Sequence, residues 1–496
     1  MDHGGGEGTL SITGGGQVSS TSTYIGYRGG KGVVSVDGTG SSLSSSPGLY
    51  VGYYRCRSDG GVDYGGGEGT LSITNGGQVS ISISNGTYIG SKGGKGLVTV
   101  DGSGAGGMAS WLNSGWLFVG EGRDIDRSVD YGLGEGTLNI SNGGQVSSGS
   151  TYIGHRGGTG TVSVRRGSSL NAGILYVGDP QLTINGVSYK SEGTLNVGDA
   201  GDASSSGTLI SHTTAIIGGY GGSGLINIHG MGSAWTHTGD AHVGANAAGN
   251  LGTGTLNIAG GSTNISGTLR LWSGGTLNAG GGTITVGTIQ NAGTLRLARG
   301  TVAAGQYAQE PGGVLQAPLR DATSTGHGLL TVGGAATLDG TLQITLEDGF
   351  VPSHTDRFRI VNAGSRSGRF QSILGREIEP GRSFSVHYTD TNVELLAGEL
   401  LDAEIGGLWD VADTMRIGGQ FTWGGALVKD GPGVLVLDWE LAHIGDPMED
   451  LGWLCIRSWR YGNDHLAVGG IGQRDELFAA YEAAGGATVL PAIVSW

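Results

Sequence analysis

The feature that most constrains the fold is a motif that returns three times in the same order. GEGTLSI at 6–12 recurs at 67–73 and, as GEGTLNI, at 134–140, so the copies lie 61 and 67 residues apart. Three further markers follow in each copy: TYIG (23–26, 87–90, 151–154), VSV or VTV (34–36, 98–100, 162–164) and LYVG or LFVG (49–52, 117–120, 175–178). Such a chain is built from stacked units that cannot bury a core alone.

Each marker has the chemistry of a short β-strand. In TLNI, Leu138 and Ile140 fall on one face and Asn139 on the other, because side chains alternate along a strand. Glycine brackets nearly every marker and permits tight corners. We therefore expect strands of about three to five residues whose stacked neighbours cover their apolar faces.

Two arrangements accommodate such strands. One is an antiparallel sandwich or barrel, and the other is a parallel β-solenoid in which equivalent strands of successive coils pair. Asn-Gly hairpin signals are few, and the period divides into roughly three coils of about 20 residues. The sequence therefore favours an all-β chain, a parallel β-helix or solenoid of short, glycine-bounded strands, with a small α-helical C-terminal fragment.

Composition agrees with this fold and limits the partners. Glycine makes up 106 of 496 residues and apolar residues 37%, which suits a narrow buried column. The net charge of −15 argues against nucleic-acid binding. No apolar run approaches the roughly 18 residues of a membrane span.

The start, MDHGGGEGTLSI, has no signal-peptide pattern and falls on a repeat, which indicates a truncated N-terminus. Cys56 and Cys455 form no CxxC motif.

Two groups in the later repeats have the residue types of a site. The first group is three neighbouring histidines and an aspartate: His229, His237, His242 and Asp240. They could ligate a metal, but the favoured interpretation is that the histidines are exposed coil residues. Ser223 in GGSGL fits a GxSxG nucleophile elbow loosely, but no helix follows it. We therefore expect no catalytic site in the repeats.

Other recurring residues also have structural interpretations. Leu10 and Leu71 stand where a calcium-binding nonapeptide needs aspartate, so that site is excluded. Arg165 and Arg166 are expected at a solvated corner. A stacked aromatic ladder is favoured over a sugar-binding platform for the tyrosines that occupy one position of each unit: Tyr24, Tyr88 and Tyr152.

The repeats carry a family resemblance. The units GxGTLxI…GGxV…YIG…GxVxVDGxGS…LYVG over about 4–300 resemble the passenger domains of bacterial autotransporters. Residues 328–370 are similar to the segment that follows such repeats, and GGALVKDGPGVLVLD at 424–438 resembles the autotransporter-associated β-strand repeat. The resemblance, over about 4–436, implies a secreted or outer-membrane surface location and an adhesin-like role with host or matrix ligands.

The C-terminal segment has a different character. From about Leu437 the glycine-rich pattern ends, and PMEDLGWLCIRSWRYG predicts a helix from about 448 to 460. QRDELFAAYEAAGG predicts a second helix near 473–483, with Gly485 and Gly486 after its end.

This segment resembles the C-terminal lobe of aminoglycoside phosphotransferase-like kinases, through LDWELAHIGDPMEDLGWLCIRSWRYG at 437–462 and VGGIGQRDELFAAYEAAGG at 468–486. The resemblance implies that Asp438 of the DWE motif holds Mg²⁺ on nucleotide phosphates, because a hard cation prefers carboxylate oxygen. It also implies that Glu440 and Asp446 shape the loop, with a metal role for Glu440 as the lesser possibility.

The rest of such a kinase is not recognisable. No glycine-rich loop precedes a strand lysine, and VHYTDTNV at 386–393 has the wrong spacing for the family's HGDxxxxN catalytic loop. His387 and Asp390 are three residues apart instead of two, and Asn392 follows the aspartate by two instead of five. We therefore expect no phosphoryl transfer and no cofactor; Mg-ATP belongs only to the alternative of a truncated, inactive phosphotransferase.

The expected organisation has three parts. Residues 1–300 form the solenoid, residues 301–436 a passenger-like β region, and residues 437–496 a truncated phosphotransferase C-lobe. The solenoid contains units near 6–66, 67–133 and 134–192, followed by degenerate coils. The expected function is that of a non-catalytic surface or secreted repeat protein.

Overall fold

The computed structural model divides the chain into two compact units. One comprises Met1–Asp410 and Thr422–Gly431, and the other Val411–Phe421 and Pro432–Trp496. The structure describes residues 5–54, 65–82, 86–104, 107–122, 133–184, 187–202, 205–323, 326–379, 382–397, 409–410, 415–417, 429–430, 435–437, 455, 465–468 and 473–483.

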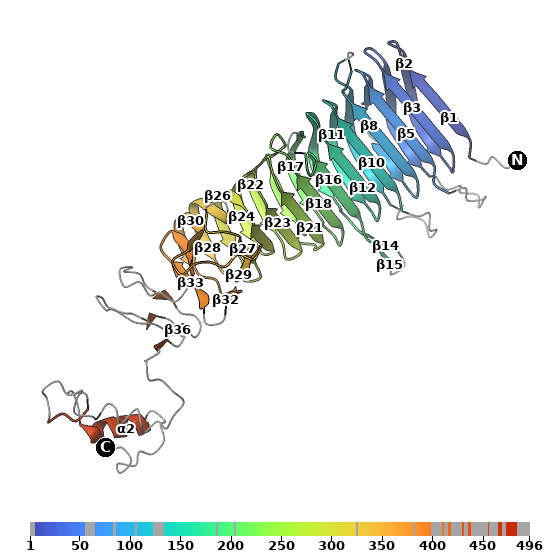
Figure 1. The fold of residues 1–496 in the computed structure, drawn as a ribbon. Helices are drawn as coiled ribbons and strands as arrows, with labels where there is room; N and C mark the ends of the chain where they lie inside the picture. Colours follow the sequence, from blue (N-terminus) through green and yellow to red (C-terminus); the bar gives the residue numbers. More distant parts are fainter. Residues whose placement is uncertain are drawn as a thin grey trace. The chain divides into compact units, whose positions relative to one another are not determined.

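The first unit is a parallel β-solenoid, which confirms the expected fold class (Figure 1). Its first sheet has 14 strands that pair in parallel with the equivalent strands of the neighbouring rungs. These strands are β1 (Glu7–Ile12), β3 (Lys31–Asp37), β5 (Glu68–Thr74), β8 (Lys95–Asp101), β10 (Glu135–Ser141), β12 (Thr159–Val164), β16 (Glu192–Val197), β18 (Ser223–Ile228), β21 (Thr253–Ile258), β23 (Gly275–Ala279), β25 (Thr294–Leu297), β27 (Val314–Leu319), β29 (Thr341–Leu346) and β31 (Ser372–Leu374).

The second sheet contains longer strands, up to 12 residues, where the sequence predicted three to five. Several are interrupted by a register shift near their middle, for example between Ser148 and Ser150, and in two rungs the strand is divided into two. The strands are β2 (Gln17–Tyr27), β4 (Ser42–Tyr53), β6 (Gln78–Ile81), β7 (Thr87–Ser91), β9 (Ser110–Glu121), β11 (Gln145–His155), β13 (Ser168–Val177), β17 (Gly207–Ile217), β19 (Ala234–His237), β20 (Asp240–Val243), β22 (Ser262–Leu271), β24 (Thr283–Asn291), β26 (Gly300–Gln309), β28 (Gly328–Leu338) and β30 (Arg357–Gly368).

The repeat period contains two rungs, and the expectation of three coils was wrong. Glu7 pairs with Lys31, and Lys31 pairs with Glu68, so the first repeat returns to its starting position after two rungs. The markers show why: VSV pairs with the TLSI strand, and LYVG pairs with TYIG. One repeat therefore consists of two successive, unequal rungs. Each rung contributes one strand to each sheet, and the corresponding strands of the two rungs differ in sequence.

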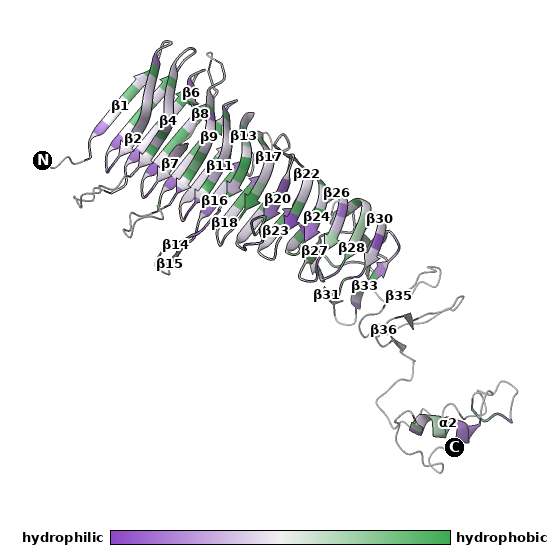
Figure 2. Ribbon diagram, turned by 180° about the vertical axis from the view of Figure 1, so that it is seen from behind, coloured by the Kyte–Doolittle hydropathy of each residue, from purple (hydrophilic) through white to green (hydrophobic). Residues whose placement is uncertain are grey.

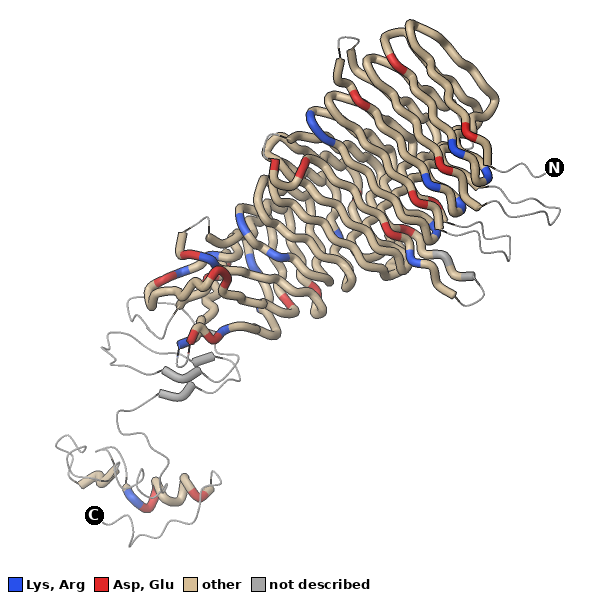
Figure 3. The backbone as a smooth tube through the Cα atoms, turned by 45° about the vertical axis from the view of Figure 1, so that its right-hand side comes forward, with Lys and Arg blue, Asp and Glu red and all other residues tan. Residues whose placement is uncertain are grey.

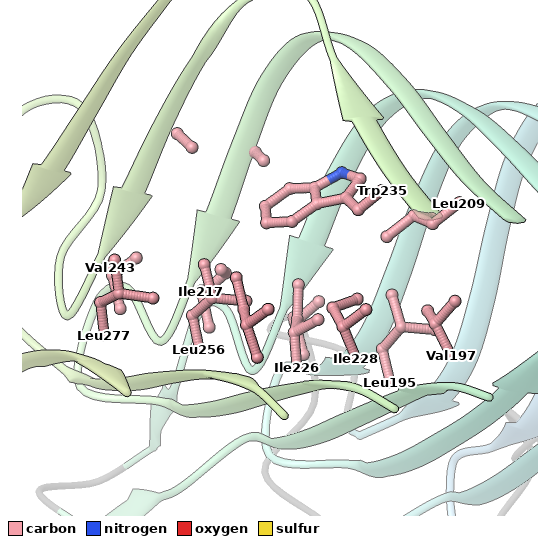
Figure 4. Close-up of a cluster of buried hydrophobic side chains, with 14 of the residues drawn as sticks. Leu195, Val197, Leu209, Ile217, Ile226, Ile228, Trp235, Val243, Leu256 and Leu277 are labelled. Carbon is pink, nitrogen blue, oxygen red and sulfur yellow. The ribbon is translucent and has the colours of Figure 1, made fainter. Parts of the chain in front are cut away.

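Apolar side chains fill the space between the two sheets. Figure 4 shows Leu195 and Val197, Ile226 and Ile228 from the first sheet facing Ile217 and Val243 from the second, with Trp235 above them. The strands of the first sheet alternate buried and half-buried residues, and hydrophobic residues recur from strand to strand (Figure 2). Each fully buried Leu, Ile or Val contributes roughly 1.5–3 kcal/mol, so a narrow column suffices in a glycine-rich chain.

Polar side chains on the outer face of the first sheet also stack. Asn227 Nδ2 donates to Asn196 Oδ1 at 2.8 Å, Asn257 Nδ2 donates to Asn227 Oδ1 at 2.8 Å, and Asn278 Nδ2 donates to Asn257 Oδ1 at 2.6 Å. Opposite charges alternate at the first position of five strands, visible as alternating blue and red segments near the N-terminal end in Figure 3: Glu7, Lys31, Glu68, Lys95 and Glu135. Because opposite charges on adjacent strands attract, this row favours the observed register.

Antiparallel strands finish the described solenoid. β34 (Asn392–Ala397) pairs antiparallel with both β30 and β33 (Arg382–Tyr388), and β33 pairs antiparallel with β32 (Glu377–Glu379). The buried rings of Phe358 and Phe384 pack edge to face at 6.1 Å beneath this region. A small hairpin, β14 (Leu182–Ile184) with β15 (Val187–Tyr189), extends from one coil.

In the remaining segments the described elements are short. Helix α2 (Arg474–Ala483) confirms the helix expected near 473–483, whereas the helix expected at 448–460 lies outside the described residues except for Cys455, which is buried. Two further parallel strand pairs are β35 (Trp409–Asp410) with β37 (Lys429–Asp430) and β36 (Met415–Ile417) with β38 (Leu435–Leu437). In the part of the chain that is described, no helix has the length and apolarity needed to cross a membrane.

Candidate functional site

The metal ligand implied by family resemblance cannot be placed. Asp438 lies outside the described residues, as do Glu440 and Asp446. The strand that precedes this aspartate, β38, pairs in parallel with β36. The assignment of Mg²⁺ to Asp438 therefore stays a prediction.

The histidine group does not have the exposed character expected from the sequence. His237 is buried: its Nδ1 lies 2.8 Å from Ser211 Oγ and its Nε2 lies 3.0 Å from the Asp240 carbonyl oxygen. His242, half-buried on β20, accepts a 3.4 Å hydrogen bond from Trp272 Nε1. Over the described residues, no three His, Cys, Asp or Glu side chains gather as a metal-binding group.

Burial explains the histidine chemistry. Desolvation lowers the pKa of His237, so its neutral form is favoured, and Trp235 Nε1 donates to the same Ser211 hydroxyl at 3.0 Å. The expectation of exposed coil histidines was wrong for His237 because residue 237 points inward from the second sheet, which the repeat pattern did not reveal. His237 is a hydrogen-bonded part of the interior.

Three other candidates occupy structural positions. Ser223 begins strand β18, so no strand-to-helix elbow is formed there. Arg165 forms an ion pair with Asp199, with Nε 2.6 Å from Oδ1, and Arg166 is exposed, which confirms the expected solvated corner. The segment VHYTDTNV forms the end of β33, a turn and the start of β34, and His387 pairs with Glu394 across the two strands.

The recurring tyrosines form a longer ladder than the sequence predicted. Six aromatic rings stack one per rung on the outer face of the second sheet, with centroid separations of 4.6–5.2 Å and interplanar angles of 1–20°. The expected Tyr24, Tyr88 and Tyr152 alternate with residues from the LYVG and LFVG markers, giving the order Tyr24, Tyr50, Tyr88, Phe118, Tyr152 and Tyr176. The stacked-ladder interpretation is confirmed.

This geometry limits what the ladder can bind. A sugar ring stacks on an open aromatic face, but the faces of the interior rings are covered by their neighbours in the ladder. Tyr24, at the end of the stack, is 42% exposed, whereas Phe118 is 6% exposed. The ladder therefore stabilises the rungs, with each pair contributing on the order of 1 kcal/mol, and presents mainly ring edges to a ligand.

A column of polar residues runs beside the ladder, at the corner after each YIG or FVG marker. Ser91, Glu121 and His155 occupy equivalent positions in successive rungs, and Asp179 follows Gly178 at the next corner. Ser91 Oγ donates to Glu121 Oε2 at 2.8 Å, while Glu121 Oε1 lies 3.8 Å from His155 Nδ1, too far for a hydrogen bond. All four side chains are buried.

Burial alters the protonation of this column. Desolvation lowers the pKa of His155, and the Glu121 carboxylate only partly opposes it. Desolvation raises the pKa of Asp179 to about 7. Asp179 therefore keeps its proton up to about neutral pH, but the buried side chains of the column are too enclosed to act on a substrate in bulk solution.

In alternate rungs, the residue directly after the column position is a cation. Arg28, Lys92 and Arg156 have φ angles of 50°, 53° and 49°, a left-handed conformation that turns the corner. Arg28 Cζ lies 5.0 Å from the ring centroid of Tyr27, and Lys92 Nζ lies 5.6 Å from that of Tyr53. These contacts attach the cations to the aromatic surface.

The sequence contained the signal for the missed residues. Tyr50, Phe118 and Tyr176 stand at the second position of LYVG and LFVG, as the tyrosine does in TYIG. Treating these markers as one strand type would have placed the six rings in one column. The buried Glu121 and Asp179 had no such signal, because acidic residues after a glycine are usually exposed.

Comparison with known proteins bears on the C-terminal segment. A comparison with curated proteins found no match. A family model described as the phosphotransferase enzyme family matches residues 425–489, a range that includes Asp438 and α2 and begins before residue 437, the start of this segment predicted from the sequence. The C-terminal segment is thus similar to the phosphotransferase enzyme family, in agreement with the resemblance seen in its sequence.

Proposed function

We propose that this chain is a non-catalytic, adhesin-like repeat protein, the passenger part of a bacterial autotransporter exposed at the cell surface or secreted. The observation that carries the proposal is the long stack of parallel rungs, whose outer side chains recur in register from rung to rung. A solenoid presents an extended lateral surface, and such surfaces commonly serve binding.

The outer chemistry of the rungs supports contact with polar ligands. The first sheet presents serine, threonine and asparagine between buried Leu, Ile and Val residues. The net charge of −15 disfavours nucleic acid, so host or matrix surface ligands are the proposed partners.

The adhesion proposal is tested by measuring binding of the intact, purified chain to immobilised matrix proteins and glycans. Saturable binding to one class, lost after thermal unfolding, is expected. Uniformly weak signals that match a folded control protein of similar charge would reject an adhesive role.

Location requires a separate measurement. Antibody labelling of intact cells of the source organism should detect the solenoid at the surface or in the medium. Signal that appears only after cell lysis would contradict the proposed location and leave the binding result to be explained otherwise.

The second candidate is a truncated phosphotransferase-family protein, and the family match over 425–489 favours it. In this case Asp438 contributes to Mg-ATP binding without phosphoryl transfer. Mg-ATP should raise the melting temperature of the wild-type chain but not that of Asp438→Asn. Equal shifts in both proteins, or none in either, would contradict this role.

A further inference from the structure

Three arginines converge on one tyrosine near the C-terminal end of the described solenoid. Arg366 lies on β30, Arg369 follows that strand, and Tyr388 ends β33. The guanidinium carbon of Arg366 lies 5.2 Å from the centroid of the Tyr388 ring, and that of Arg369 lies 5.5 Å from it. Arg376, which precedes β32, also acts electrostatically on the Tyr388 hydroxyl. Sheet pairing thus gathers cations from separate segments.

The cluster carries excess positive charge in an acidic protein. Burial and the neighbouring Arg369 together lower the pKa of Arg366, which shows that like charges are held close. Asp390 is the acidic group that acts on Arg366, but across the described residues neither Arg366 nor Arg376 has a carboxylate within ion-pair distance. Packing such cations together is unfavourable without a counter-charge.

Hydrogen bonding indicates where that counter-charge belongs. Arg366 Nε donates to the Thr389 carbonyl at 2.6 Å and Nη1 donates to the Gly368 carbonyl, so backbone contacts hold this guanidinium in place. In contrast, Arg376 Nε is buried without a hydrogen-bond partner in the described structure, and the buried Tyr388 Oη has no acceptor there. A buried donor without an acceptor destabilises the folded state, and both groups lack an acceptor.

We propose that Arg366, Arg369, Arg376 and Tyr388 form a binding site for a tetrahedral oxyanion, the sulfate or phosphate group of a ligand. Such a group supplies several acceptor oxygens and two negative charges. Arginine forks match these oxygens in pairs, and the tyrosine hydroxyl supplies a further donor. The four side chains are half-buried, so the cluster borders solvent while Tyr388 Oη and Arg376 Nε lie beneath its surface. The inference is independent of the proposed adhesive role.

Calorimetric titration of the full chain with sodium sulfate and with sodium phosphate tests the site, at constant ionic strength maintained with chloride. Saturable one-to-one binding is expected. Arg376→Gln should weaken it at least tenfold, and Tyr388→Phe severalfold, since the latter removes only the hydroxyl. Glucose 6-sulfate and glucose 6-phosphate then distinguish an ester from a free ion: an ester ligand predicts binding at least as tight as that of the inorganic anion.

Arg357→Gln is the matched control. Arg357 begins β30, the strand that carries Arg366, and is exposed, so the substitution removes one arginine charge without removing a side chain of the proposed site. Its affinity should stay within about twofold of wild type. Circular dichroism and melting curves confirm that each variant is folded. Absence of saturable binding, or equal weakening in Arg357→Gln and Arg376→Gln, would overturn the proposal.

Discussion

At the scale of single residues, the glycine of the GTL motif is required by space. A Cβ at Gly136 would lie 2.1 Å from the Ile89 carbonyl oxygen and 2.3 Å from the Gly120 nitrogen. Both atoms belong to backbone corners of the second sheet, which cannot move independently of their rungs. The narrowness of the coil therefore explains why this position repeats as glycine.

Alanine substitution separates this requirement from ordinary strand propensity. Gly136→Ala should lower the free energy of unfolding by about 1–3 kcal/mol, because the new methyl group overlaps backbone atoms. Gly8 occupies the equivalent position in β1, but a Cβ added there would meet no atom within 4 Å, so Gly8→Ala should be neutral or slightly stabilising. Urea unfolding measures both; similar costs in the two variants would refute the explanation.

The buried Asp179 predicts a particular pH dependence. Its pKa is about 7 in the folded chain and 3.8 when unperturbed, so between these values the folded state keeps a proton that the unfolded state releases. Stability from this group therefore falls as pH rises from about 4 to 7. Asp179→Asn should remove that loss and be more stable than wild type at pH 8, by on the order of 1–4 kcal/mol at 1.36 kcal/mol per pKa unit.

The comparison uses urea unfolding of wild type and Asp179→Asn at pH 4, 6 and 8. The difference between the two proteins isolates residue 179 from the other titrating groups. It should grow in favour of the variant with pH. A difference that is constant across the three pH values would show that Asp179 is not buried in its neutral form.

At the scale of elements, each strand depends on equivalent side chains in its neighbours. The asparagine ladder spans β16, β18, β21 and β23 through amide hydrogen bonds, while the aromatic ladder performs the same role on the second sheet. Each ladder repeats one side-chain type at one register position. A one-residue slip would turn these residues inward and the apolar residues outward, so the ladders and the core specify the same register.

The asparagine ladder predicts that position along the row matters. Asn227→Ala removes two side-chain hydrogen bonds, whereas Asn278→Ala removes the single bond to Asn257. At about 1 kcal/mol per bond, the first variant should lose about 2 kcal/mol and the second about 1. Chemical unfolding checks the ratio, and equal losses would mean that the amide bonds do not control stability.

At the scale of the whole molecule, the solenoid resembles a one-dimensional array. Each rung contacts mainly the rungs before and after it, so stability is approximately a sum of rung and interface contributions. Strand β1 pairs with β3 alone among the described strands, and Leu10 is 40% exposed, whereas Leu138 and Leu195 are fully buried. Among the described strands, the rung of β1 therefore has one neighbouring rung, whereas a central rung has two.

Hydrogen exchange should reveal this gradient. Amides of β1 are expected to exchange faster than those of β10 and β16, because opening the first rung disrupts one interface and opening a central rung disrupts two. Mass spectrometry of peptides from the intact chain provides the measurement. Uniform protection from β1 to β16 would instead indicate one fully cooperative unit.

Much of the architecture was predictable because it repeats. Ordered copies of TLNI-type strands, glycine at each corner and the 61- and 67-residue spacing identified a parallel solenoid. The glycine-rich pattern ends near Leu437, and the motifs at 437–462 and 468–486 carried the resemblance to phosphotransferases that the family match supports. The repeated strands and the distinct C-terminal segment are local or periodic features, so they can be recognised from residues close together in the sequence.

The tertiary structure alone decided which markers share a face. Pairing of Tyr24 with Tyr50 and of Leu10 with Val34 showed two rungs per repeat, where spacing suggested three. It also directed His237 inward, buried Asp179 and brought Arg366 and Arg369 to the ring of Tyr388. The sequence by itself determined the repeating strands and their apolar faces, because apolar and polar residues alternate within each segment. The register, the burial of polar groups and the contacts between distant segments were decided only by the tertiary structure, because hydrogen bonds between stacked rungs set those positions.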